Sequence, residues 1–366
     1  MTRPIQASID LGALRHNYAV AHRHAGSARV WAVVKANAYG HGLLRVAHAL
    51  SNSADGFALI EIEGAITLRQ AGLRQTILLL EGFYAADEIP LIVEHSLTAV
   101  IHSMRQVDLL VRSSAAKDAR LPVYLKLNTG MNRLGLNENE LDQAMRALVG
   151  ASQVGAITFM THFADADCDQ DGPGISEQMG RLQTMRSDLT HPLSLANSAA
   201  LLRYPESLGS GHDWARAGIM LYGSSPFPEL HSASELDLRP VMTLTSELIA
   251  VRDLVPGDRI GYGGTFVAVA PMKVGVLACG YADGYPRHAP TGTPVLVEGR
   301  RSRTLGRVSM DKICVDLTEI PESRIGSPVV LWGKDLSADE VGAAAATISY
   351  ELFCALAARV PVVEIT

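Results

Sequence analysis

The chain has few cysteines, and their spacing gives them no common role. Its four cysteines are Cys168, Cys279, Cys314 and Cys354 in a chain of 366 residues. No two of them form a C-x-x-C pair, which argues against a zinc site and against the disulfide framework of a small secreted domain. The pattern is typical of buried thiols in a reducing compartment, so we expect a cytoplasmic protein.

Long apolar runs and a strong excess of basic charge are also missing. No run approaches the ~18 apolar residues of a membrane span, and the first six residues lack the apolar core of a signal peptide. The formal net charge is −6, whereas a nucleic-acid-binding protein usually carries a basic face. No G-x-G-x-x-G follows an apolar run, which disfavours a dinucleotide-binding fold. We therefore expect neither a membrane nor a nucleic-acid partner.

What is present is the composition of an ordinary folded protein. Hydrophobic residues make up 48% of the chain and charged residues 19%, which excludes a disordered chain. A single domain usually takes about 100–200 residues, so a chain of 366 residues predicts two domains.

The first two thirds of the chain alternate between short apolar runs and amphipathic stretches. Helical periodicity marks Glu63–Ala71 and Glu138–Val149. Such alternation builds parallel sheets, and eight units in this length predict a (β/α)8 barrel over residues 1–232, with an open doubly wound sheet as the competing topology. The expected strands are Val30–Lys35, Gly56–Ile60, Thr76–Leu80, Leu97–Ile101, Pro122–Asn128, Val154–His162, Pro192–Asn197 and Ala217–Tyr222.

The pattern changes after a connection rich in serine and proline, which runs from Ser224 to Leu238. Short β-branched segments between glycine and proline turns then predict a mainly β domain over residues 233–366. One long helix is expected there, at Asp339–Ala358. Examples of the expected strands are Thr243–Val251, Lys273–Ala278, Thr293–Glu298, Lys312–Leu317 and Val329–Leu331.

Polar residues follow several of the expected barrel strands, where barrel enzymes place their active sites. Lys35 ends the first strand, and a partly desolvated amine there has a lowered pKa and is nucleophilic. A lysine at this place could equally extend to solvent, His162 alone could be a core histidine, and Arg133 alone a surface residue. Because such residues follow several strands at the same rim of the barrel, an active site there is favoured. The other segments at this rim are Lys126–Arg133, Asn197-Ser198 and Trp214–Ile219.

The decapeptide Val33–Gly42 (VVKANAYGHG) resembles the motif that carries the pyridoxal-phosphate lysine of alanine racemases. Further motifs resemble this family in the same order along the chain, from residue 128 to residue 351. They are Asn128–Arg133, Arg216–Ile219, Gly261–Gly263, Gly280–Gly284, Gly306–Asp311 and Thr347–Glu351.

The resemblance implies interconversion of L-alanine and D-alanine with pyridoxal 5′-phosphate, either supplying D-alanine for peptidoglycan or degrading it. Removing an α-proton and returning it to the opposite face needs two bases, and the resemblance assigns them to Lys35 and Tyr262. It assigns substrate binding to Arg133 and Met310. Lys126 matches a position that is often carbamylated in the family, where the added carboxylate would orient the arginine.

The resemblance also implies a set of cofactor-binding residues and a homodimer in which each β domain closes the partner's barrel. Tyr281 and Asp311 would line the access route to the site. No metal is implied. The cofactor-binding residues would be Lys35, Tyr39, His162, Ser198, Arg216, Gly218, Ile219 and Tyr350.

Three other interpretations share the fold or the cofactor. A broad-specificity racemase of the same fold has no distinguishing mark in the sequence. A barrel decarboxylase would usually pair the pyridine nitrogen with an acidic residue, and Arg216 argues against it. A single-domain, non-catalytic pyridoxal-phosphate-binding protein would lack everything after about residue 235.

Overall fold

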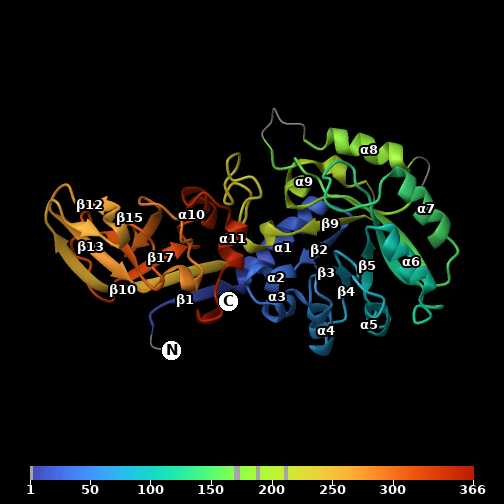
Figure 1. Cartoon of the computed structure of the whole chain (residues 1–366), viewed down its shortest axis with the longest axis horizontal. Coiled ribbons are helices and arrows are strands. Elements are labelled where there is room, and N and C mark those ends of the chain that lie inside the picture. Colours follow the sequence, from blue (N-terminus) through green and yellow to red (C-terminus); the bar gives the residue numbers. More distant parts are fainter. Residues whose placement is uncertain (1–2, 169–173, 187–189, 210–212) are drawn as a thin grey trace.

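The computed structural model of the chain describes residues 3–168, 174–186, 190–209 and 213–366. They form two domains that lie end to end along the longest axis of the molecule (Figure 1). In the described part of the chain, no helix is long and apolar enough to cross a membrane.

The first domain is built on a sheet of eight parallel strands, which confirms the (β/α)8 barrel. The strand order is β8-β7-β6-β5-β4-β3-β2-β9. The amide of Arg216 in β9 donates to Ala196 O, just after β8, at 2.9 Å, and this contact closes the ring. The strands are β2 (Arg29–Val33), β3 (Gly56–Leu59), β4 (Thr76–Leu79), β5 (Thr98–Ile101), β6 (Leu121–Lys126), β7 (Val154–Met160), β8 (Leu193–Ser194) and β9 (Trp214–Ala217).

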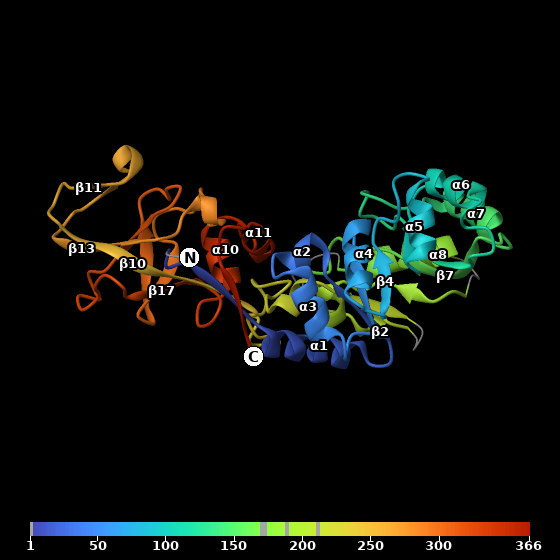
Figure 2. The same ribbon diagram turned by 90° about the horizontal axis from the view of Figure 1, so that it is seen from below.

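Helices surround these strands (Figures 1 and 2). Every residue of β3 and β5 is buried, as expected of parallel strands covered on both faces. The two helices expected from periodicity are confirmed as α4 and α7, and α7 begins with a capping box between Asn137 and Glu140. The helices are α1 (Leu11–Ala25), α2 (Lys35–Tyr39), α3 (Leu43–Leu50), α4 (Ile62–Gln70), α5 (Glu88–Glu94), α6 (Met104–Arg112), α7 (Glu138–Leu148), α8 (Ser176–Arg186) and α9 (Ser198–Arg203).

The last barrel strand lies earlier in the chain than the sequence predicted. Strand β9 ends at Ala217, and the expected strand Ala217–Tyr222 is instead a 3₁₀ turn from Ile219 to Tyr222. The reason is that residues Trp214–Ala217 pair with β2, after which Gly218 leaves the extended conformation with φ −109° and ψ −104°. The expectation was therefore wrong by about one strand length.

The second domain is mainly β, as predicted. Its sheet has the order β13-β16-β15-β14-β17-β10-β1-β18 and includes β1, which comes from the start of the chain and pairs with β10 and β18. A separate hairpin pairs β11 with β12. The strands are β1 (Gln6–Asp10), β10 (Met242–Leu254), β11 (Arg259–Ile260), β12 (Phe266–Val267), β13 (Met272–Leu277), β14 (Pro294–Val297), β15 (Arg300–Leu305), β16 (Ile313–Asp316), β17 (Pro328–Trp332) and β18 (Val362–Ile365).

In this domain the predicted long helix is divided, and strands β1, β11, β12, β15 and β18 have no counterpart among the strands given above as expected. The long helix predicted at Asp339–Ala358 is two short helices, α10 (Ala338–Ala344) and α11 (Ser349–Cys354). Ala346 separates them with a left-handed φ of 54°, which a continuous helix does not allow. Strand β15 was missed because its charged residues hide the apolar alternation of a strand.

Helix α11 brings the second domain onto the barrel next to α2. A Cβ at Gly40 would lie 2.0 Å from Phe353 O, so only glycine permits this approach of the two backbones. The rings of Tyr39 and Tyr350 lie 5.9 Å apart across the same junction. The domain junction therefore forms one wall of the region at the end of β2.

Candidate active site

A cavity of about 400 Å³ opens at the carboxyl ends of the barrel strands. It brings together ten of the residues expected to form the site. A second cavity, of about 530 Å³, lies in the β domain and is lined by none of these residues. The first cavity is therefore the candidate active site. The ten are Lys35, Tyr39, Lys126, Arg133, His162, Ser198, Arg216, Gly218, Ile219 and Tyr350.

Lys35 is presented by an unusual turn. The four residues Ala36–Tyr39 all have left-handed φ values between 50° and 54°. Such a conformation costs L-amino acids about 1–2 kcal/mol per residue, and strain of this kind concentrates at functional sites. Asn37 supports the turn because its Oδ1 accepts from Leu43 N at 2.8 Å, and buried His41 donates Nδ1–H to Tyr39 O at 2.8 Å.

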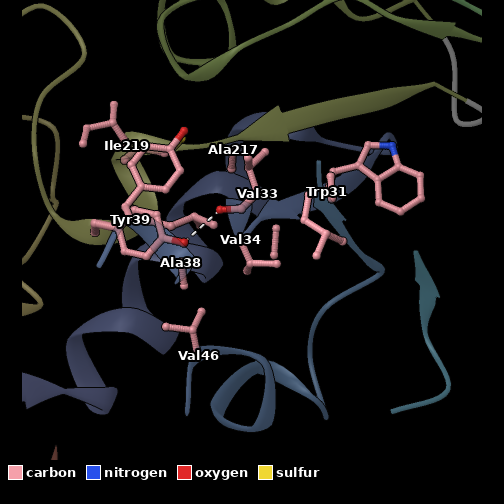
Figure 3. Close-up of a cluster of buried hydrophobic side chains, with 14 of the residues drawn as sticks. Trp31, Val33, Val34, Ala38, Tyr39, Val46, Ala217 and Ile219 are labelled. Atoms are coloured by element: carbon pink, nitrogen blue, oxygen red, sulfur yellow. Dashed lines mark hydrogen bonds between the residues drawn. The ribbon is translucent and has the colours of Figure 1, made fainter. Parts of the chain in front are cut away.

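The hydrophobic cluster behind this turn is continuous with the barrel core. Figure 3 shows Val33 of β2 and the following Val34 between Trp31 of the same strand on one side and Ala38, Tyr39 and Ile219 on the other. Tyr39 stacks on Tyr222 with ring centroids 4.7 Å apart, and the Tyr222 hydroxyl donates to Val33 O at 2.8 Å. The turn is thus held between the strand that precedes it and the 3₁₀ turn after β9.

Two lysines and two arginines, Lys35, Lys126, Arg133 and Arg216, line this pocket. Burial and the nearby Arg133 guanidinium lower the pKa of the Lys35 amine, because both disfavour a second positive charge. Lys126 is only 9% exposed, and its pKa falls to about 8 through burial and then through the charges of Arg216 and Arg133. Both lysines are therefore better nucleophiles near neutral pH than ordinary lysines.

Arg216 is held rigidly by backbone carbonyls. Its Nη1 donates to Ser194 O at 2.5 Å, and its Nη2 donates to Thr161 O at 2.7 Å and to Leu195 O at 3.1 Å. Its Nη2 also lies 3.4 Å from Nδ1 of His162. Burial lowers the pKa of Arg216 to about 10, and burial together with the Arg216 charge lowers the pKa of His162 well below its usual range. The pair therefore presents a fixed cation beside a neutral imidazole.

Another part of the cavity wall, around Gly218 and Ser198, has the composition of an anion cradle. Gly218 N donates to Ser198 Oγ at 2.9 Å, and the 3₁₀ turn that starts at Ile219 leaves its first amides without acceptors in the turn. A Cβ at Gly218 would lie 2.9 Å from the hydroxyl oxygen of Tyr39. Only glycine therefore keeps this space open, and hydroxyls and amides that converge on it suit a phosphate group.

Four expected site residues do not reach this cavity. Tyr262, Tyr281, Met310 and Asp311 lie in the β domain and are absent from its lining. Tyr262 is 70% exposed and Met310 is 53% exposed. Tyr262 follows β11, and β11 and β12 lie at the end of the molecule farthest from the barrel (Figures 1 and 2). A single chain therefore does not bring Tyr262 to Lys35.

Sequence reasoning missed several polar residues of the cavity, among them Glu81 and Cys354. Glu81 lines it and is tied by a 2.6 Å hydrogen bond from the Tyr84 hydroxyl. Glu81 follows strand β4 as Lys35 follows β2. A search for polar residues just after each barrel strand would therefore have found it. Cys354 also lines the cavity, and it stands one helical turn after Tyr350, on the same face of α11.

A barrel rim with a desolvated lysine, a fixed cation and a cluster of hydroxyls and amides has the features expected of an enzyme that uses a lysine amine with an anionic ligand. Family models described as "Alanine racemase, N-terminal domain" and "Alanine racemase, C-terminal domain" match residues 9–226 and 241–364. The chain belongs to the alanine racemase family.

Relatives match along the whole chain. An alanine racemase of Nitrosomonas europaea is 54% identical, over 100% of this chain and 99% of its own. A catabolic alanine racemase of Klebsiella aerogenes is 50% identical, over 100% of both chains. The crystal structure of a biosynthetic alanine racemase from Pseudomonas aeruginosa superimposes with a TM-score of 0.95 at 45% identity, and the match covers 100% of both chains.

Proposed function

We propose that this chain interconverts L-alanine and D-alanine with pyridoxal 5′-phosphate as its cofactor. The observation that carries the proposal is the Lys35 amine, which has a lowered pKa and shares a cavity with the anion cradle around Gly218. The names of the relatives supply the substrate, and both biosynthetic and catabolic enzymes are among them. The four unpaired cysteines support our placement of the protein in the cytoplasm.

The residues of the cavity fit this cofactor. Lys35 would hold it covalently through Nζ, and Ser198, Tyr39, Tyr350 and the amides of Gly218 and Ile219 would bind its phosphate. When bound, pyridoxal phosphate supplies a conjugated ring that stabilises the electron pair left by the departing α-proton.

Arg216 supports a racemase over a decarboxylase of the same fold. Its guanidinium, backed by His162, would face the pyridine nitrogen of the cofactor. A fixed positive donor there leaves the nitrogen unprotonated, which restrains the electron sink and so limits side reactions. The five contacts of this guanidinium fix the position of its charge in the site.

Arg133 would bind the carboxylate of the substrate, since an exposed guanidinium at the mouth of the cavity suits a planar anion. Lys126 would orient it. As a cation, Lys126 repels Arg133. Once carbamylated, Lys126 would carry a negative charge that attracts the Arg133 guanidinium. The low pKa of Lys126 supports this modification because only an unprotonated amine reacts with carbon dioxide.

The proposed mechanism uses one base on each face of the substrate and requires a homodimer. Lys35 Nζ would move the proton on one face, and the Tyr262 hydroxyl would move it on the other. Because Tyr262 is exposed on the β domain, away from its own chain's cavity, we propose that it enters the partner's cavity together with Met310. Tyr281 and Asp311 would then border the access route between the two chains.

The lysine assignment is tested by trapping. Borohydride reduction of the cofactor-loaded protein, followed by digestion and mass spectrometry, should place the cofactor on the one peptide that contains Lys35. The chain has six lysines, so five internal controls are present. Label on a peptide without Lys35 would refute the site, and L- to D-alanine conversion by the untreated protein would test the activity.

The state of Lys126 should depend on pH. At constant carbon dioxide pressure, ¹³CO₂ should produce a carbamate carbonyl signal that grows as the pH rises through about 8, where the neutral fraction of this amine increases. The measurement is ¹³C NMR of wild-type protein and of Lys126→Met. A signal of equal size in Lys126→Met would show that another amine carries the group.

A further inference from the structure

A buried glutamine outside the predicted site joins two of the loops that build it. Gln178 lies on α8 and is 6% exposed. Its Nε2 donates to Thr129 Oγ1 at 3.0 Å and to His162 O at 3.0 Å, and its Oε1 accepts from Ala164 N at 2.7 Å. One amide side chain thus makes three bonds to the segments that follow β6 and β7.

The donors and acceptors of this network can be assigned in only one way. Thr161 Oγ1 donates its single proton to Leu127 O at 2.9 Å, so in its 2.7 Å contact with Thr129 it can only accept. Thr129 Oγ1 therefore donates to Thr161, and it must accept its third contact from Gln178. This order determines the orientation of the Gln178 amide and makes a relay from Gln178 through Thr129 and Thr161 to Leu127.

Two members of the relay are attached to groups that the site uses. Thr129 stands in the loop from Asn128 to Arg133, and this loop is tightened by Asn128 Oδ1, which accepts from Asn132 N at 3.0 Å. Helix α8 packs against the same loop: a Cβ at Gly130 would lie 3.5 Å from Gln178 Cγ. The backbone of Thr161 is attached to Arg216: its carbonyl oxygen accepts a hydrogen bond from Arg216 Nη2 at 2.7 Å.

We propose that Gln178 is a positioning residue that sets where Arg133 and the His162–Arg216 pair stand in the cavity. The inference rests on the proposed function because it takes Arg133 as the carboxylate-binding group. Gln178 itself is not among the residues that line the cavity, so it acts through Thr129 and His162 and touches neither substrate nor cofactor. Loss of its donors would free the loop that carries Arg133.

The test compares two glutamines on the cofactor-loaded protein. Gln178→Met keeps the length of the side chain and removes all three bonds. Gln153→Met is the matched control. Gln153 also makes a hydrogen bond through its side-chain amide, from Nε2 to Val111 O at 2.7 Å. It immediately precedes β7 and therefore lies at the end of the barrel opposite the cavity. The probe is propionate, which has the carboxylate and methyl group of alanine without its amine, and calorimetry gives its Kd without turnover.

Gln178→Met should bind propionate about 10- to 100-fold more weakly, and the KM for alanine should rise more than kcat falls, since a misplaced group of about 1 Å has effects of this size. Gln153→Met should change Kd by less than about twofold even where it lowers the melting temperature. Equal effects of the two substitutions would overturn the positioning role.

Gln178→Glu adds a readout that a purely structural role would not move. An ionised carboxylate has no proton for Thr129 Oγ1 or His162 O, whereas the protonated acid can donate one bond. The propionate affinity of this variant, divided by that of wild type at each pH, should therefore improve as the pH falls from 8 to 6. The charged or titratable groups in contact with the network are Glu177, Arg181, His162 and Arg216, and the division by wild type cancels their own titration.

A second pair of variants keeps the proposal testable if Gln178→Met does not fold. Thr129→Val removes the hydroxyl at similar shape and should weaken propionate binding as Gln178→Met does, while Thr129→Ser should restore it. A ratio for Gln178→Glu that is flat with pH, or full affinity in Thr129→Val, would refute the relay. If wild-type protein neither binds propionate nor racemises alanine, the proposed function fails instead.

Discussion

Tyr262→Phe protein is expected to exchange the α-hydrogen of D-alanine with solvent deuterium and to leave that of L-alanine nearly unexchanged. In the proposed mechanism Lys35 serves the face of the D-enantiomer and Tyr262 that of the L-enantiomer. The substitution keeps the aromatic ring and removes its one proton-transferring group. Loss of a general base costs about 10²- to 10⁴-fold, so the two exchange rates should separate clearly in ¹H NMR spectra recorded in D₂O.

The reverse preference is expected when the other base is removed. Lys35→Ala, with methylamine added to replace the missing amine in part, should exchange L-alanine faster than D-alanine. The paired variants control for each other because each retains one base and the same cavity. Equal loss of exchange for both enantiomers in Tyr262→Phe would mean that one base serves both faces, and the two-base mechanism would be abandoned.

Mixing two inactive proteins should restore activity. In a dimer of Lys35→Ala with Tyr262→Phe, one site combines the intact Lys35 of the second chain with the intact Tyr262 of the first. The other site lacks both bases. Random exchange of equal amounts would make half of the dimers mixed, so about a quarter of all sites should become active. The measurement is alanine racemisation before and after subunit exchange.

A matched mixture shows that exchange has occurred. Adding an equal amount of the double variant Lys35→Ala/Tyr262→Phe to wild type should lower the active sites from half to about a quarter of the total, because every mixed dimer has no complete site. If this loss is observed and the two single variants still do not complement each other, the shared-site model is wrong. The 70% exposure of Tyr262 in the single chain is the structural reason to expect complementation.

The outline of the barrel and its chemistry could be predicted because they depend on local patterns. Apolar runs bounded by turns identify buried parallel strands whatever their neighbours are, and the carboxyl ends of such strands share one rim. That is why Lys35, Lys126 and His162 could be placed together in advance, and why the cavity contains them. Glu81 follows the same rule and was overlooked rather than unpredictable.

Other features depended on partners far away in the sequence. Residues Trp214–Ala217 form the last strand because β2 offers them a pairing edge, and Gln6–Asp10 join the second domain because β10 and β18 flank them. The helix expected over Asp339–Ala358 breaks at Ala346, and α11 then packs against the turn that carries Lys35. Local propensity cannot reveal such choices, since the deciding contacts lie outside any short window.

By itself the sequence determined the two-domain architecture, the barrel with its rim of basic and hydroxyl side chains, and the resemblance to one family. Only the tertiary structure decided the left-handed turn at Ala36–Tyr39, the lowered pKa of Lys126 and the relay through Gln178. Periodicity and strand ends are properties of neighbouring residues, which a sequence displays directly. Strain, desolvation and hydrogen-bond direction are properties of groups brought together from distant positions, and they exist only once the chain has folded.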